Sequence, residues 1–266
     1  MTFLHGKDSR LAFGGFDIGG AFNDLALDVS RDIHDVTTFG NAGHRQFAGL
    51  RDGSASLQGL FDTDYDGIFS GEMAVTSPDV FMVGMNGLAV GAPVTFGMVR
   101  EALYKQTGKS TDMVTAAIDF KGSFAEGDAN GNVDAQGGGL FSGVVIANQT
   151  FGGSTQVVYD RGASAPTASQ RVAFGVHSDE LPDATHAYLA TLEHSADNVT
   201  YAALPGMALS WGGGNNGAGW YMFPTSHGGV IVHNAAQTVN RYLRVTSNQM
   251  ALSGLPASWK VAAAVF

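Results

Sequence analysis

The sequence predicts a mainly β protein: a β-sandwich or barrel domain with about one helix, followed by a second β-sandwich domain. Short apolar runs recur at roughly ten-residue spacing with turn residues between them, a pattern typical of such folds. Residues 54–61 alternate small polar and apolar side chains, which is the period of a half-buried strand. Glycine, which favours turns, supplies 37 of the 266 residues.

The first half of the chain contains the candidate strands of one domain. Two apolar runs at its start are separated by Gly19 and Gly20, which are a turn signal. The strands are expected at residues 10–16, 21–30, 54–61, 80–85, 93–100 and 113–120. The helix is expected in one of two short windows, residues 66–75 or residues 99–106.

A glycine-, aspartate- and asparagine-rich stretch, GDANGNVDAQGGG at 127–139, has the composition of a linker or a long exposed loop. We therefore expect a domain boundary there, between a first domain at residues 1–137 and a β-sandwich domain at residues 138–266. The strands of the second domain are expected at residues 140–147, 155–159, 170–176, 185–193, 198–204, 219–223, 229–233, 239–246 and 258–266.

Composition excludes several classes of protein. The absence of cysteine excludes a disulfide scaffold, thiol catalysis and Cys-ligated zinc, and favours a reducing compartment. The N-terminus has no apolar signal-peptide core and no run of 18 apolar residues occurs, so neither secretion nor a membrane span is expected. A net charge of −10 argues against a protein that grips nucleic-acid phosphates.

The charges are few and unevenly distributed. Only 14% of residues are charged, against about 25% in a typical soluble domain, which suits a chain covered by neighbouring copies. Residues 1–137 hold 18 acidic and 9 basic side chains, whereas residues 138–266 hold 6 and 5. The acidic character therefore belongs to the first half.

No motif in the chain predicts catalysis or a cofactor. Asp62, Asp64 and Asp66 match the opening of an EF-hand loop, but its twelfth position is Met73, so we expect an acidic turn and leave cation binding open. The sequence at 108–110, GKS, lacks the earlier glycine of a P-loop, because that position is Leu103. The eight histidines form no metal-binding pattern and no Gly-x-Ser-x-Gly elbow occurs, so the protein is expected not to be an enzyme.

Three aromatic residues flank a glycine-rich segment of the second half. Trp211, Trp220 and Tyr221 surround residues 212–219. Exposed on a β-sandwich, they would stack on sugar rings or anchor a protein interface. Equally, Trp220 and Tyr221 would begin a strand and point one into the core and one outward.

Several segments, in order, resemble the major tail proteins (tail tube proteins) of long-tailed bacteriophages. The first are DVTTFG at 35–40, FAGLRD at 47–52 and SASLQG at 54–59, closing on Phe61 and Asp62. In the second half, YDRG at 159–162, HSADNVTYAAL at 194–204 and VNRYLRV at 239–245 are similar to segments of a two-part branch of that family. The resemblance spans most of residues 10–266 and departs from the pattern around residues 205–230.

The resemblance implies a structural virion protein. Such subunits oligomerise into rings, and the rings stack into the tail tube through which DNA is ejected into the host. The implied partners are other copies of the chain, the tape measure protein, the tail terminator and the baseplate or distal tail proteins, with no membrane. The protein would assemble in the bacterial cytoplasm and reside in the virion tail. Residues 1–137 would then form the tube wall, and their acidic side chains would line the lumen and repel the DNA backbone.

The stretch from Asp35 to Gly53 is expected to be a contact arm between subunits or rings, because it is too long for a tight turn and carries two aromatics. Its candidate contact residues are Thr37, Thr38, Phe39, His44, Arg45, Phe47, Leu50 and Arg51.

Two questions stay open at the level of sequence. The second domain either decorates the outside of hexameric rings or forms a second wall domain in trimeric, pseudo-sixfold rings. The alternative function is a lectin-like β-sandwich that binds carbohydrate through Trp211, Trp220 and Tyr221. A hydrolase is the third reading, and no residue spacing supports it.

Overall fold

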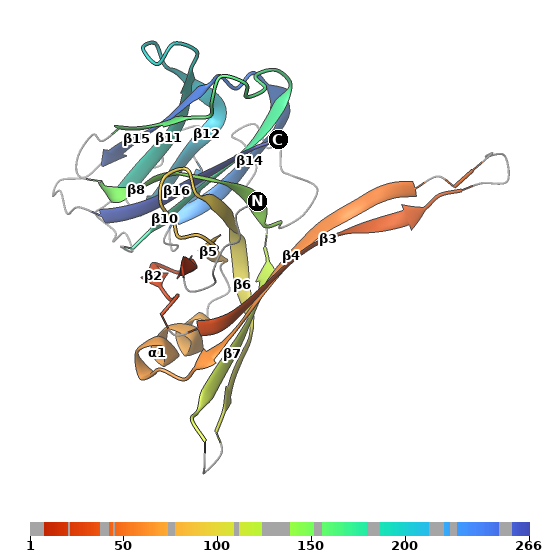
Figure 1. The fold of residues 1–266 in the computed structure, drawn as a ribbon, viewed down its shortest axis with the longest axis vertical. Helices are drawn as coiled ribbons and strands as arrows, with labels where there is room; N and C mark the ends of the chain where they lie inside the picture. Colours follow the sequence, from red (N-terminus) through yellow and green to blue (C-terminus); the bar gives the residue numbers. More distant parts are fainter. Residues whose placement is uncertain are drawn as a thin grey trace.

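The computed structural model describes residues 8–20, 22–37, 43–44, 46–73, 78–108, 112–123, 139–151, 156–179, 187–212, 221–223, 228–249 and 257–266. Within these ranges the chain forms sixteen strands and one helix, so the predicted mainly β fold is confirmed. The strands form an eleven-stranded sheet and a five-stranded sheet. Figure 1 shows two layers at one end of the molecule and a long hairpin that leaves the body at the other.

The second half of the chain forms the β-sandwich that its sequence predicts. Part of the large sheet, in the order β14-β10-β16-β8, faces the five-stranded sheet β13-β12-β11-β15-β9. The strands are β8 (Phe141–Phe151), β9 (Gln156–Asp160), β10 (Gln170–Ser178), β11 (Ala187–Ser195), β12 (Ala202–Gly212), β13 (Tyr221–Phe223), β14 (Gly228–Gln237), β15 (Tyr242–Gln249) and β16 (Ala257–Val265). Buried Phe174, Leu192, Val245 and Trp259 belong to the core between the layers.

The large sheet continues from the sandwich into the first half of the chain. Strand β8 pairs with β6 (Pro93–Thr107), which pairs in turn with β5 (Asp79–Gly84), β1 (Arg10–Phe13) and then β2 (Phe16–Asp17). Met82 and Phe174 lie in the same hydrophobic cluster although 92 residues separate them. Strands on both sides of residue 137 thus share a sheet and a core, and the expected division into two domains there stays a prediction.

A four-stranded part of the same sheet extends away from the sandwich. Its order is β3-β4-β7-β6, where β3 is Phe22–Asp35, β4 is Gln46–Leu60 and β7 is Thr115–Gly122. One face buries Leu57, Ile118 and Phe120 in a second hydrophobic cluster. The opposite face carries the intervening polar side chains, as the alternation in residues 54–61 predicts.

Helix α1 (Thr63–Glu72) covers the apolar face of this four-stranded part. Asp62 is the N-cap: its side chain accepts a hydrogen bond from Asp64 N at 2.8 Å, and the acidic first turn complements the helix dipole. Phe69 points inward against the rings of Phe13 and Phe120. The helix overlaps the first of the two expected windows.

The second window, residues 99–106, is strand. Residues 99–107 pair with β7, and Val99 and Tyr104 face the core. A helix at this position would leave the backbone N–H and C=O groups on that edge of β7 without their partners in β6. Strands β3 and β4 are also longer than expected. The stretch expected to be a loop from Asp35 to Gly53 contains the first eight residues of β4.

Candidate interaction surface

The most distinctive feature of the molecule is a two-stranded arm formed by residues 29–35 of β3 and 46–53 of β4. Strand β7 pairs with β4 only from Ser54 to Leu60, so from Gly53 outward β4 pairs among the described strands only with β3. Figure 1 shows this ribbon extending far beyond the body. No third strand or second layer supports the arm within the part of the chain that the structure describes, and an isolated two-stranded hairpin is at best marginally stable in water.

Aliphatic side chains on the arm are open to solvent. Val29 is 44% exposed, Ile33 is 64% exposed and Val36, just past the end of β3, is 50% exposed. These three side chains contribute little to the stability of the folded chain while they face water. They are of the kind that become buried in a protein interface.

A set of polar contacts organises the outer end of β3. Asp35 Oδ1 accepts hydrogen bonds from the backbone nitrogen of Thr37 at 2.8 Å and from the Thr37 hydroxyl, and Asp35 Oδ2 lies 3.0 Å from His44 Nδ1. The Thr37 hydroxyl, then the Thr37 N–H and His44, lower the pKa of Asp35 below its usual value. This network holds the two sides of the hairpin end together.

The inner end of the arm is set by a close contact. A Cβ added to Gly53 would lie 2.9 Å from both the Cγ and the backbone nitrogen of Leu140, which is fully buried. A Cβ added to Gly97 of β6 would likewise lie 3.0 Å from the Cδ2 of Leu140. Leu140 therefore packs against the sheet where the arm begins, and this contact requires glycine at positions 53 and 97.

The arm contains the sequence-predicted contact residues. Thr37 and His44 lie at its outer end, and the backbones of Phe47, Leu50 and Arg51 belong to β4. Thr38, Phe39 and Arg45 lie outside the described residues, and so do the side chains of Phe47, Leu50 and Arg51. Their role in contacts stays a prediction.

The four-stranded part has an open edge on each side. In the described part of the chain β3 pairs only with β4. Strand β6 pairs with β5 up to Val99, and its remaining residues, 100–107, pair only with β7 among the described strands. Open edges present unpaired N–H and C=O groups that readily accept another strand.

The polar face between the two edges carries small and charged side chains. Ser54, Ser56 and Gln58 occupy it on β4. Strand β3 contributes the exposed Asp24, Asp28 and Asp32, and β6 the exposed Arg100 and Lys105. Sequence reasoning missed these charged residues; the recurrence of aspartate at every fourth position from 24 to 32 was the signal available.

The acidic turn at Asp62 and Asp66 has structural roles. Asp62 caps α1, and Asp66 Oδ1 accepts hydrogen bonds from Tyr104 Oη at 2.7 Å and Gln106 Nε2 at 2.5 Å, tying the helix to β6. Burial raises the pKa of Tyr104, and the hydrogen bond to Asp66 is the second largest cause of this rise. Within the described ranges no group of three or more His, Asp or Glu side chains is placed to hold a metal ion.

The aromatic patch expected in the second half is described only in part. Trp211 and Tyr221 lie on the neighbouring strands β12 and β13, where Leu209 pairs with Tyr221. Their side chains and the whole of Trp220 lie outside the described residues. A different aromatic, Tyr201, is covered by the Arg244 guanidinium at 3.9 Å from the ring centre, and Arg244 also forms an ion pair with Glu193 at 2.5 Å.

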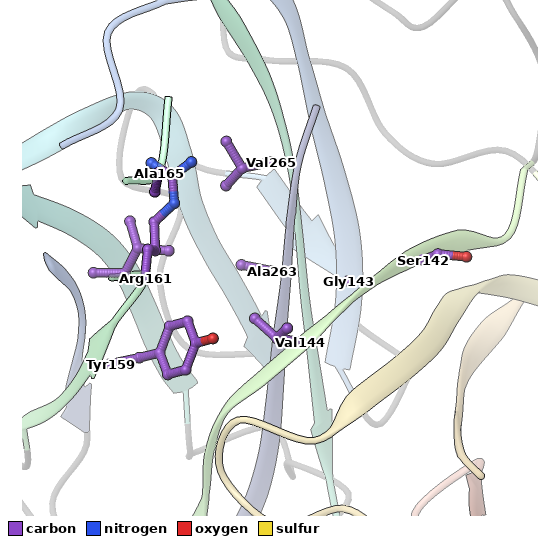
Figure 2. Close-up of a pocket in the computed structure, with 9 residues that line it drawn as sticks. Ser142, Gly143, Val144, Tyr159, Arg161, Ala165, Ala263 and Val265 are labelled. Carbon is purple, nitrogen blue, oxygen red and sulfur yellow. The ribbon is translucent and has the colours of Figure 1, made fainter. Parts of the chain in front are cut away.

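A cleft of about 380 Å³ separates the two sandwich sheets beside β9. Figure 2 shows Tyr159 and Arg161 on one side and Val144, Ala263 and Val265 on the other. The Arg161 guanidinium donates to the carbonyl oxygens of Val239, Asn240 and Pro166 and to Gln170 Oε1, at 2.8 to 3.2 Å. Arg161 is thus a brace between loops, and the residues lining the cleft include no nucleophile with an adjacent base.

The part of the chain that the structure describes contains no helix long and apolar enough to cross a membrane.

Comparison with known proteins gives similarities at the level of solved structures only. No protein-family model matches the chain, and no curated protein does. A chain from the virion of a native gene transfer agent particle is 17% identical with a TM-score of 0.37, over 45% of this chain and 93% of that one. A chain from the tail of an empty gene transfer agent particle, solved with C6 helical symmetry, is 17% identical with a TM-score of 0.38 over the same shares.

The SPP1 Dit protein, described as a paradigm of the hub adsorption apparatus in phages that infect Gram-positive bacteria, is 9% identical with a TM-score of 0.30. That match covers 97% of this chain and 99% of the other.

Proposed function

We propose that the protein is a structural subunit of a phage-type tail, and that its copies form rings which stack into the tail tube. The observation that carries this proposal is the arm together with the four-stranded sheet from which it grows. Among the described residues the arm has exposed aliphatics and no third strand, and the sheet has an open edge on each side. Both features are liabilities in a monomer and both are removed by assembly.

The strand directions are compatible with a closed ring. Neighbours in the order β3-β4-β7-β6 are all antiparallel, so β3 and β6 run in opposite directions. Strand β3 of one copy placed beside β6 of the next continues the antiparallel pattern. Such a head-to-tail contact repeats around a circle, and a circle of copies leaves no open edge.

The wider role follows from the sequence resemblance. The partners would be other copies of the chain, the tape measure protein, the tail terminator and the baseplate or distal tail proteins. DNA would pass through the lumen without specific binding during ejection. The protein would assemble in the bacterial cytoplasm and function in the virion tail, without catalysis.

Electron microscopy of two matched variants tests the proposal. Purified wild-type protein at high concentration is expected to form rings or tubules. Ile33→Ser removes an exposed aliphatic from the arm, and Val199→Ser removes one that is 80% exposed on a loop of the sandwich. Because neither side chain is in a core, both variants should fold, and only Ile33→Ser should lose assembly. A wild-type protein that stays monomeric at every concentration, or equal behaviour of the two variants, contradicts the proposal.

The carbohydrate-binding alternative has one supporting observation, the adjacency of the Trp211 and Tyr221 backbones on β12 and β13. It predicts that a monomeric protein binds a glycan array and that Trp211→Ala abolishes binding. The tube proposal predicts no glycan signal that depends on Trp211.

A further inference from the structure

We propose that the two open edges of the four-stranded sheet are complementary to each other, so that β3 of one copy pairs with β6 of the next in a register set by charge. In this register Asp32 faces Arg100 of the neighbouring copy and Asp28 faces its Lys105. The inference rests on the proposed ring and names the surface and the register that build it.

The β3 edge presents a regular acidic row. Asp24, Asp28 and Asp32 are exposed and recur every fourth residue, which places them on one face of a strand. Strand β3 itself contains no extra residue between Asp24 and Asp32, because the irregularity near Arg31 adds a residue to β4 instead. The three carboxylates therefore lie on the polar face, each four residue positions from the next.

The β6 edge presents a basic row with the same spacing. Arg100 pairs with Lys121 and Lys105 pairs with Ala117, four residues apart along β7. An extra residue in β6 between Glu101 and Leu103 keeps both bases on the polar face although five positions separate them in sequence. Leu103, 42% exposed, lies between them.

The rows of the sheet connect the two edges directly. Along one row the residues are Asp28, Ser54, Lys121 and Arg100. Four residue pairs away, another row runs from Asp24 through Gln58 and Ala117 to Lys105. Each row thus ends in an acid at β3 and a base at β6.

Closing the sheet into a barrel shifts one edge against the other. A shift of four residues per four-stranded unit gives a strand tilt of about 35°, from a rise of about 3.4 Å per residue and a strand spacing of about 4.8 Å. Barrel strands tilt by about 35–45°. With the apolar face outward, the right-handed twist of sheets directs this shift toward the C-terminal end of β3. Asp32 then lies opposite Arg100 and Asp28 opposite Lys105, with Ser30 beside Leu103.

The same charges exclude the competing arrangements. A twofold dimer through two β3 edges would bring aspartates against aspartates, and one through two β6 edges would bring bases against bases. Only the head-to-tail contact pairs opposite charges, and head-to-tail contacts are the ones that generate rings. The charge pattern therefore selects ring formation over dimerisation, in addition to setting the register.

Cysteine crosslinking tests the register, and the absence of native cysteine makes the chain a clean background. The variant with Asp28→Cys and Lys105→Cys should form disulfide-linked multimers on oxidation of the assembled protein, because directly opposed antiparallel residues meet the geometry of a disulfide. The matched control, Asp24→Cys with Lys105→Cys, probes the unshifted register and should remain uncrosslinked. Crosslinking of the control in preference to the first variant would overturn the proposed register.

Charge exchange tests the energetic role. Asp28→Lys with Asp32→Lys should reduce the assembled fraction by at least about tenfold, because like charges then meet across the edge. Adding Lys105→Asp and Arg100→Asp should restore assembly. These exposed positions leave the fold intact, which circular dichroism verifies. If wild-type rings form but charge exchange changes nothing, the edge inference is wrong and the ring proposal stands; if wild-type rings never form, the ring proposal itself fails.

Discussion

Leu140 shows how one side chain decides where an extended element begins. It packs against the backbones of Gly53 and Gly97, on two strands that flank it, and so joins the root of the arm to the body. Sequence alone does not distinguish Gly53 from other glycines of the chain, because the contact is with a residue 87 positions away.

Gly53→Val should destabilise the folded protein by about 1–3 kcal/mol, because the added side chain overlaps Leu140 and forces the sheet to move. Urea unfolding measures the change in free energy of unfolding. The control is Gly43→Val, where a Cβ meets no atom within 4 Å and little change is expected. Equal stability of the two variants would show that Leu140 does not fix the root of the arm.

Asp197 should make stability depend on pH in the acidic range. The N–H groups of Thr200 and Val199, followed by the Ser195 hydroxyl, lower its pKa from 3.8 to about 2. Because the pKa is depressed by folding, the native state holds fewer protons than the unfolded state in this range. Its stabilisation is therefore present above pH 3.8 and lost as pH falls through about 2.

Urea unfolding at a series of pH values checks this dependence. The wild type should lose more stability between pH 3.8 and about 2 than Asp197→Asn, which has no carboxyl group to titrate. The same slope in both proteins would remove Asp197 as the cause.

At the scale of elements, the arm is separable from the body in packing terms. Beyond Gly53 its strands pair among the described strands only with each other. The second hydrophobic cluster includes Leu25 and Leu27 but none of the described side chains of the outer arm, residues 31–51. The described side chains of the arm beyond Gly53 therefore lie outside the second hydrophobic cluster.

Removing the outer arm should leave the body folded. Deleting residues 31–51 and joining Ser30 to Asp52, which are paired, through a two-residue Asn-Gly turn keeps the hairpin register. The expected change in the free energy of unfolding is small, within about 1 kcal/mol, because few buried contacts are lost. Circular dichroism and size-exclusion chromatography should show a folded monomer that no longer assembles; an unfolded product would show that the arm supports the core.

Helix α1 is short and contains two glycines, Gly67 and Gly71, at which an added Cβ meets nothing within 4 Å. Gly67→Ala should raise the free energy of unfolding by about 0.5–1 kcal/mol, because alanine has the higher helix propensity and restricts the unfolded chain. Thermal unfolding measures it. A loss of stability would mean that position 67 has a packing role that its open surroundings do not indicate.

At the scale of the whole molecule, the polar face of the four-stranded sheet is the surface that would line a lumen. Its charged residues on the paired strands are Asp24, Asp28, Asp32, Asp52, Asp119, Arg100, Lys105 and Lys121, an excess of acids over bases. The apolar face is already covered by α1, so it would face outward.

An image of the assembled tube should therefore show a net acidic lumen built from this face. Such a lumen repels the DNA backbone and lets DNA slide without phosphate contacts. Replacing Ser54 and Ser56 by lysine should slow DNA ejection from particles without affecting assembly, because both positions are on the polar face away from the edges. A basic lumen in the wild-type tube contradicts the prediction.

Much of this architecture was predictable because it depends on local patterns. Alternation in residues 54–61 predicted half of β4 with the correct faces, whereas the segment from Asp62 that was expected to be an acidic turn is the N-cap and first turn of α1. Residues 46–53, QFAGLRDG, show no regular alternation of apolar and polar side chains, so the sequence predicts a loop there, whereas pairing with β3 makes them strand.

By itself, the sequence determined the mainly β class, the positions of most strands and the sandwich of the second half, because side-chain periodicity is a local property. Only the tertiary structure decided that β6 and β8 join both halves in one sheet and that β3 and β4 extend as an arm. It also decided that the same rows of paired residues run from an aspartate on β3 to a basic residue on β6. The physical reason is that strand pairing joins residues far apart in the chain, and no local pattern specifies which strand becomes the neighbour of which.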